Sequence, residues 1–257
     1  SESASVDRLA LDALGYEDDA VVRYSYTGEG RPYTSEDTQG DLTVQGAQLA
    51  DAVERLARRE PDAVVDIFAH SMGGVVALLA LAELEERDFP LGRLGLTAAV
   101  GTPFQGADLA TAVQVAGSRP SGRTGLALAE RWLGTGLDPD SEAASQLATT
   151  SSLMAEVVEA GAPEGMAVVS VAARGDLVVP APRAALPGAR NVVVPEAGVE
   201  AHSDMVAAEE TLRELHLALL DHPPRCVSQW DVVQDAVLGH GIAATQEAVG
   251  QALLALP

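Results

Sequence analysis

A serine between two apolar runs is the clearest candidate for chemistry in the sequence. Ser71 lies in AHSMGG (residues 69–74). A nucleophilic serine must stand clear of a sheet so that a base and a substrate carbonyl can both reach its oxygen, and a tight, strained turn from strand to helix achieves this. Such a turn requires small residues two before and two after the serine, and these are Ala69 and Gly73. The alternative is a serine that only caps an ordinary helix.

The elements around this turn alternate between strand and helix patterns. Short β-branched runs bounded by turn residues predict a parallel sheet that is covered on both faces. Helical patterns lie between them, over residues 42–56, 74–87 and 205–219, and Pro61 stops the first of these. The predicted fold is therefore α/β, with a doubly wound, mostly parallel sheet. The predicted strands are Val21–Tyr26, Ala63–Ala69, Gly95–Val100, Met166–Ala172 and Arg190–Val194.

In this setting two motifs resemble those of a known family. AHSMGG, preceded by VVDIF and followed by a helix, resembles the nucleophile elbow of α/β-hydrolase-fold serine lipases and esterases. Several bacterial members carry Ala at the first small position, as Ala69 does here. GTPFQGA (residues 101–107) resembles a turn that is common in the same enzymes. The resemblance covers roughly residues 6–221 and does not include the tail.

The resemblance implies a catalytic triad in the chain order Ser, Asp, His, each on a loop after a strand. Asp176 stands on the expected loop, in RGDLVVP, and His202 follows the last predicted strand, in PEAGVEAHSDM. Ser71 is then the nucleophile, His202 the base and Asp176 the acid. The backbone N–H of Met72, at the start of the helix, is one expected oxyanion donor.

The second oxyanion donor of the family lies on a loop after an earlier strand, and the sequence has no such strand. Ser1–Leu14 reads as the helix that would follow it, with Gly15 as its C-cap. We expect the given sequence to start downstream of that strand, with Ser1–Ser3 as the remnant of the oxyanion loop. The alternatives are a truncated fold, or a tail that supplies the missing elements.

Several further residues are candidates for lesser roles. His70 is next to the nucleophile, so it is not expected to act as the base, and with Phe104 and Tyr33 it is a candidate for lining a substrate pocket. Tyr33 could equally pack against its neighbours. Asp66 on the strand before the serine is predicted to be structural, bonding neighbouring loops. Asp204, just beyond the predicted base, is expected to cap the following helix.

Two segments depart from the strand–helix rhythm. Residues 106–165 show only helical pieces, namely Asp108–Ala116, Gly125–Leu133 and Ser141–Ala160. They predict a helical cap insertion over the substrate, and lengthened crossover helices are the equal alternative. After two prolines, the tail reads as two further helices of an extension. The predicted domains are an α/β-hydrolase domain (1–222) and a helical C-terminal extension (223–257).

Composition excludes several classes of function. The chain has 257 residues and a net charge of −22, and all 16 basic residues are Arg, so binding to nucleic acid is not expected. The five histidines are scattered, and neither a metal site nor a cofactor is predicted. One cysteine, Cys226, cannot form an intrachain disulfide. No apolar run is long enough to span a bilayer. A cytoplasmic and a secreted location both stay open, as does the oligomeric state.

The resemblance therefore implies a lipase-type serine hydrolase that cleaves carboxylic esters through an acyl-enzyme, with a small-molecule or lipid-like ester as substrate. The same triad could serve an acyltransferase, thioesterase or amidase. A different class, a non-catalytic binding protein that keeps the fold, is also compatible with the sequence.

Overall fold

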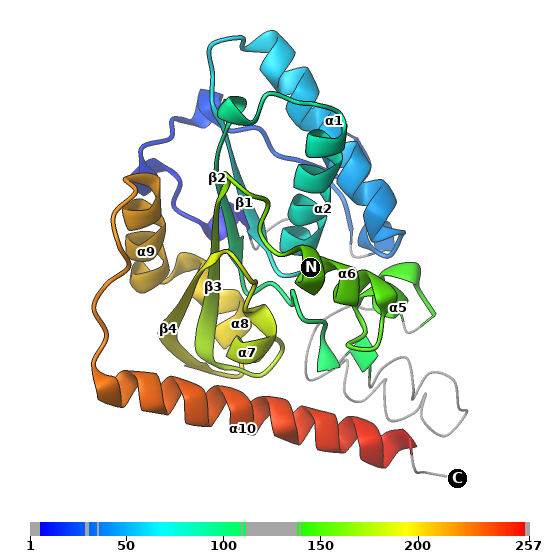
Figure 1. Cartoon of the computed structure of the whole chain (residues 1–257), viewed down its shortest axis with the longest axis vertical. Coiled ribbons are helices and arrows are strands. Elements are labelled where there is room, and N and C mark those ends of the chain that lie inside the picture. The colour runs from blue at the N-terminus through cyan, green and yellow to red at the C-terminus, as the bar shows by residue number, and fades with distance from the viewer. Residues whose placement is uncertain are drawn as a thin grey trace.

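The structure is a computed structural model of the chain, and it describes residues 6–28, 31–34, 36–108, 110, 111, 138 and 140–254. Within them a parallel sheet is flanked by helices, and one long helix crosses its lower end (Figure 1). The fold is α/β, as predicted. The α-helices are α1 (Leu42–Arg59), α2 (Met72–Glu86), α5 (Glu142–Leu147), α6 (Ser152–Ala160), α7 (Ala181–Ala184), α8 (Ala201–Asp204), α9 (Glu209–Leu219) and α10 (Gln229–Leu254).

The sheet has the order β1-β2-β3-β4, and each neighbouring pair is parallel. Because parallel strands end at the same edge, the loops after them meet there, and this is where α/β proteins place their ligand sites. Among the described strands, β1 ends next to the serine and β3 ends at the predicted acid. The strands are β1 (Val65–His70), β2 (Leu94–Val100), β3 (Ala167–Asp176) and β4 (Arg190–Gly198).

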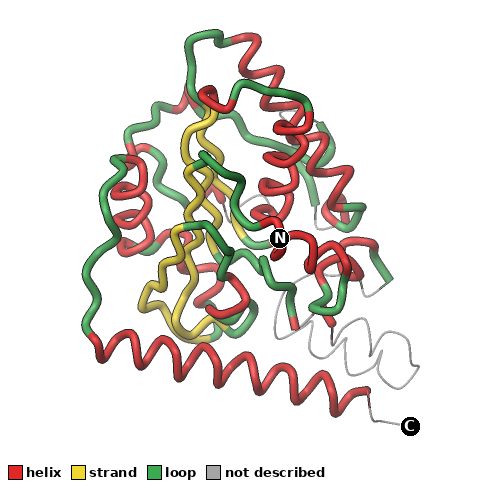
Figure 2. The backbone as a smooth tube through the Cα atoms, in the orientation of Figure 1, coloured by secondary structure: helices red, strands yellow, loops and turns green. Residues whose placement is uncertain are grey.

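Each face of the sheet carries its own core. Side chains alternate along β2, so Ala99 packs with α2, α5 and α6 on one face, whereas Ala98 and Val100 pack with α8 and α9 on the other. Helices α1 and α2 lie on one side of the strands and α9 on the opposite side (Figures 1 and 2). Helix α2 is apolar all round, because it lies between α1 and the sheet.

Local signals fix the ends of α1. The side chain of Asp41 accepts a hydrogen bond from the N–H of Thr43 at 2.8 Å, which caps the start of the helix. The helix ends at Arg59, two residues before Pro61, as the sequence predicts. The four strands predicted after residue 60 are also present, each within three residues of its predicted start.

The segment before α1 differs from prediction. Val21–Tyr26 forms no strand, because it pairs with none of the described strands. Val6–Arg8 and Asp12–Leu14 are 3-10 turns and not parts of one helix. They are separated at Leu9, whose side chain is buried in the core on the α9 face. Gly15 does end the second turn, in the left-handed conformation. Residues 1–5 lie outside the described residues. The remaining 3-10 turns are Asp18–Ala20, Glu36–Thr38, Leu91–Arg93 and Met205–Ala207.

The later helices also differ in detail. The predicted helix over 205–219 is a 3-10 turn followed by α9, and Ser141–Ala160 is divided into α5 and α6, each capped by a serine hydroxyl. Gly125–Leu133 and most of Asp108–Ala116 lie outside the described residues, so the cap stays a prediction. The tail is one helix, α10, and not two. Helix α10 contains no proline, and its glycines do not interrupt it. The boundary between residues 222 and 223 stays a prediction.

Candidate active site

Ser71 occupies the turn between β1 and α2 in a strained backbone conformation. Its φ is 56° and its ψ is −133°, a region that residues other than glycine rarely adopt. The end of β2 holds it there. The Ser71 N–H donates to the Val100 carbonyl at 2.9 Å, and the Thr102 hydroxyl donates to the Ser71 carbonyl at 2.9 Å. The strain is thus balanced by bonds to a neighbouring strand, and the hydroxyl stands at the sheet edge.

The two glycines after the serine differ in the space that a side chain would have. A Cβ at Gly73 would lie 3.9 Å from the Cβ of Ala69, an ordinary contact. A Cβ at Gly74 would lie 2.0 Å from Thr102 Oγ1 and 2.8 Å from Thr102 Cβ, so Thr102 or the helix would have to shift. The tightest steric demand therefore falls on Gly74. Thr102 was not singled out from the sequence, although its place in the GTPFQGA motif was the available signal.

His202 reaches the serine from α8. Its Nε2 lies 3.0 Å from Ser71 Oγ, and its Nδ1 lies 2.7 Å from Asp176 Oδ2. A carboxylate accepts only, so Nδ1 carries the proton, and Nε2 is free to accept from the serine hydroxyl. The His202 side chain is 12% exposed and Asp176 is fully buried. The three residues predicted as a triad therefore form one continuous chain of hydrogen bonds.

Asp176 is oriented by the backbone that follows it. Its Oδ1 accepts from the N–H of Val178 at 2.7 Å and from that of Val179 at 2.9 Å. Its second oxygen is thereby directed at His202. These backbone donors could not be predicted from the sequence, because any residue types in the same turn would supply them.

His70 lies behind His202 at the end of β1. Its Nε2–H donates to the backbone carbonyl of His202 at 2.9 Å, and the two rings are 4.8 Å apart. Burial, with repulsion from His202 as the second cause, lowers the pKa of His70 from its ordinary 6.5 to about 3. The ring is therefore neutral at physiological pH. The structure places it as a support of the histidine loop, and a role in lining a pocket stays a prediction.

The first turn of α2 contains the N–H that was predicted as one donor for an oxyanion. The N–H of Met72 begins the helix, so it has no carbonyl one turn back within α2 to bond. Met72 directly follows the serine in the chain, and the positive end of the helix dipole strengthens its N–H as a hydrogen-bond donor. The second donor was predicted near Ser1–Ser3, which lie outside the described residues.

The other predicted pocket residues pack against neighbours. Phe104 is 1% exposed and lies in the core cluster with Met72. Tyr33 is half-buried and meets the ring of Tyr26 edge to face, with ring centres 5.0 Å apart. The Tyr26 hydroxyl lies 3.9 Å from the position of a Cβ at Gly73, two residues after the serine. Burial raises the pKa of both tyrosines.

Two aspartates were assigned structural roles from the sequence. Asp66 joins elements as predicted, accepting from the Tyr16 hydroxyl at 2.7 Å and from the N–H of Leu96. Asp204 does not cap a helix with its side chain, and that prediction was wrong. Its carboxylate pairs instead with Arg8 at 2.9 Å, because α8 turns it toward the N-terminal segment.

Other features bear on alternative functions. Within the part of the chain that the structure describes, no group of three His, Cys, Asp or Glu side chains is placed to hold a metal ion. None of the described helices is long and apolar enough to cross a membrane. Cys226 is exposed and unpaired.

A parallel sheet that presents a serine on the turn into a helix, with an aspartate at the end of β3 and a histidine on α8, defines the chain as an α/β hydrolase. Residues 3–228 match the sequence profile of the alpha/beta hydrolase family, so the chain belongs to that family. This membership supports a hydrolase. No curated protein matches the chain by sequence.

Two lipases with solved structures share the fold. Aspergillus fumigatus lipase B aligns with a TM-score of 0.57 and 14% identity, over 100% of this chain and 61% of its own. The Bacillus licheniformis lipase BlEst2 aligns in its mature form with a TM-score of 0.50 and 17% identity, over 70% of this chain and 75% of its own. In its propeptide form it aligns with a TM-score of 0.53 and 16% identity, over 74% and 43%. At these identities the likeness shows the fold.

Proposed function

We propose that the protein is a serine hydrolase that cleaves carboxylic esters through an acyl-enzyme, with Ser71, His202 and Asp176 as its triad. The observation that carries the proposal is the continuous chain of hydrogen bonds from Ser71 Oγ to His202 and on to Asp176, at 3.0 and 2.7 Å. These distances are within the reach that proton transfer from a nucleophile to a base requires. The lipase structures that share the fold favour esters over other acyl compounds.

The mechanism follows from the protonation states. As Ser71 Oγ attacks the acyl carbonyl, its proton passes to His202 Nε2, and Asp176 stabilises the imidazolium through Nδ1–H. The Met72 N–H donates to the oxyanion that forms on the former carbonyl oxygen. The tetrahedral intermediate collapses, and the leaving alcohol takes the proton from Nε2. Water then attacks the acyl-enzyme, with His202 again as the base, and releases the acid.

A fluorophosphonate probe tests the nucleophile directly. We expect the folded protein to be labelled and the label to map to Ser71, and we expect Ser71→Ala to lose both label and ester turnover. A matched control is Ser203→Ala, which removes the hydroxyl next to His202 on α8 and should leave the labelling intact. If the folded wild-type protein takes up no label, the chain is a non-catalytic member of the fold.

A substrate panel tests the reaction class. Turnover of p-nitrophenyl esters of increasing acyl length should exceed that of matched thioesters and amides. If a thioester or an amide is the better substrate by kcat/KM, the triad stands and the ester assignment fails. If product forms only when an alcohol is added to accept the acyl group in place of water, the protein is an acyltransferase.

A further inference from the structure

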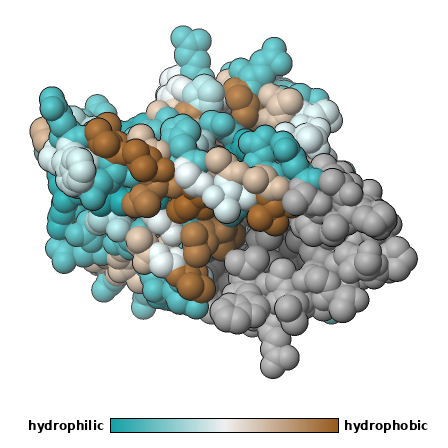
Figure 3. All heavy atoms as spheres, turned by 90° about the horizontal axis from the view of Figure 1, so that it is seen from below, coloured by the Kyte–Doolittle hydropathy of each residue, from teal (hydrophilic) through white to brown (hydrophobic). Residues whose placement is uncertain are grey.

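Helix α10 lies across the sheet edge at which the strands end (Figures 1 and 2). It packs on β3 and on α7, the two elements that flank the loop of the catalytic acid. Apolar side chains of α10 such as Trp230 and Val237 are exposed, and apolar patches lie on the surface seen from below (Figure 3). The contacts that matter here lie on the inner side of the helix, on either side of Asp176.

The first contact is made two residues before the acid. The Arg174 guanidinium bonds three side chains from one stretch of α10, those of Asp231 at 3.2 Å, Gln234 at 3.4 Å and Asp235. The Arg174 side chain is 17% exposed and that of Asp235 is 14% exposed. Ion pairs this sheltered are only weakly screened, and loss of one partner leaves a charge partly buried.

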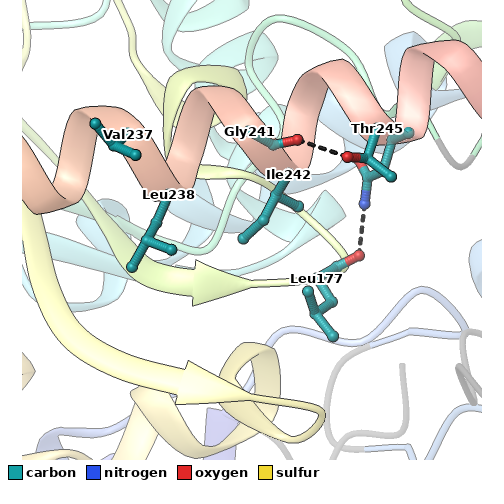
Figure 4. Close-up of a pocket in the computed structure, with 7 residues that line it drawn as sticks. Leu177, Val237, Leu238, Gly241, Ile242 and Thr245 are labelled. Atoms are coloured by element: carbon teal, nitrogen blue, oxygen red, sulfur yellow. Dashed lines mark hydrogen bonds between the residues drawn. The ribbon is translucent and has the colours of Figure 1, made fainter.

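The second contact is made one residue after the acid. Gln246 Nε2 donates to the Leu177 carbonyl at 2.6 Å, at one end of an apolar groove of about 340 Å³ that Leu177 forms with Leu238 and Ile242 (Figure 4). Further along, a Cβ at Gly239 would lie 2.9 Å from Pro182 Cδ, so helix and loop are in close contact. The loop from Asp176 to α7 is thus held against α10 at both ends.

Stability alone does not account for Gln246. Its Oε1 is buried and has no hydrogen-bond partner among the described residues. A buried acceptor without a partner costs free energy, and an apolar side chain of similar size would suit the groove better. The amide does, however, hold the backbone next to Asp176.

We propose that α10 is a positioning element for the catalytic acid, acting through Arg174 and Gln246, so that the rate of acyl transfer depends on these two contacts. The proposal rests on the proposed function. Neither residue touches the reacting atoms. They fix the loop whose Val178 and Val179 N–H groups orient the Asp176 carboxylate, and that carboxylate in turn orients His202.

The test compares kcat and KM for a p-nitrophenyl ester in variants at both contacts of the full chain. In Arg174→Gln we expect kcat to fall about tenfold or more with little change in KM, because small misplacements of catalytic groups carry losses of this order. Arg174→Lys, which keeps a charge for the two aspartates, should recover part of the loss. Arg213→Gln, which breaks the exposed pair with Glu209 on α9, is the matched control and should match wild type.

Gln246→Leu separates positioning from stability. We expect its thermal unfolding temperature to be unchanged or raised while its kcat falls, whereas Gln251→Leu on the exposed side of α10 should leave kcat unchanged. If Gln246→Leu and folded Arg174→Gln both turn over ester at the wild-type rate, the proposal is wrong. If kcat falls only in proportion to the unfolded fraction, α10 is merely structural and the proposal is equally wrong. Absence of fluorophosphonate labelling in the wild type would instead remove the proposed function itself.

Discussion

His70 donates a hydrogen bond from Nε2 to the backbone carbonyl of His202, so the residue before the proposed nucleophile holds the proposed base. The side chain of His70 is almost fully buried, and its ring lies against that of His202. Two histidines in contact could have competed for one proton. Burial lowers the pKa of His70 and keeps its ring neutral, so only His202 is left to accept the proton in the proposed mechanism.

The lowered pKa of His70 predicts how stability depends on pH. Between pH 6.5 and about 3 the unfolded chain takes up a proton on His70 that the folded chain does not. The contribution to the free energy of unfolding is therefore complete above pH 6.5 and is lost as the pH falls toward 3, by up to about 1.4 kcal/mol per pH unit. His70→Gln keeps an N–H donor but does not titrate, so its urea unfolding should show a flatter pH dependence in this range.

The comparison must isolate His70 from the carboxylates that also titrate in this range. His216→Gln, a variant of a histidine on α9 away from the site, should keep the wild-type slope. An equal slope in His70→Gln and the wild type would show that His70 takes up its proton normally in the folded state.

Asp176→Asn should disable the triad without unfolding the protein. The carbonyl of the new amide would face the Val178 and Val179 N–H groups, because only an oxygen can accept from them. The NH2 of that amide would then face His202 Nδ1 and force the proton onto Nε2, which could no longer accept from Ser71. We expect kcat to fall by about 10⁴-fold, the size of loss that a reversed tautomer causes in a serine triad.

The check is a steady-state rate measured beside a near-UV circular dichroism spectrum. A wild-type spectrum with the rate lost supports the tautomer argument. A rate reduced only a few-fold would show that Asp176 does not set the protonation of His202.

Gly74→Ala and Gly73→Ala should differ sharply although the glycines are neighbours. A Cβ at Gly74 would collide with Thr102, whose hydroxyl also holds the Ser71 carbonyl, whereas a Cβ at Gly73 meets only ordinary contacts. Overpacking of this kind costs about 1–3 kcal/mol, while alanine in an open helical position is neutral or favourable. Chemical denaturation of both variants measures the difference, and equal stabilities would contradict the steric argument.

The sequence predicted the parts of the structure that repeat a local pattern. The four described strands have β-branched runs, and the serine, aspartate and histidine follow three of them, so chain order alone brought the candidate site together. Val21–Tyr26 has the same composition but forms no strand, because a strand exists only when another strand pairs with it, and composition does not reveal the partner.

What the sequence could not show were contacts that depend on orientation. His70 was expected near the substrate, and nothing in its neighbours in sequence indicates that its ring turns toward the backbone of a residue far along the chain. The bonds of α10 to Arg174 and Leu177 are equally remote in sequence. The tail pattern predicted helices without indicating where they dock, since the apolar residues of α10 are spread around the helix and mark no single face.

Tyr16→Phe tests whether Asp66 joins the N-terminal segment to the sheet. The Tyr16 hydroxyl donates to the Asp66 carboxylate at 2.7 Å, and burial together with this bond raises the pKa of Tyr16. The ring also meets Phe68 edge to face, and that contact survives the substitution. Since hydrogen bonds to charged groups contribute about 1.5–3 kcal/mol, we expect the free energy of unfolding to fall by about 2 kcal/mol.

Tyr24→Phe is the matched control. The Tyr24 hydroxyl makes only a 3.3 Å bond to the carbonyl of Gln45, so its removal should lower the free energy of unfolding much less. Urea unfolding at neutral pH measures the free energy of unfolding of both variants and of the wild type. A loss in Tyr24→Phe as large as that in Tyr16→Phe would mean that the charge of Asp66 adds nothing beyond an ordinary hydrogen bond.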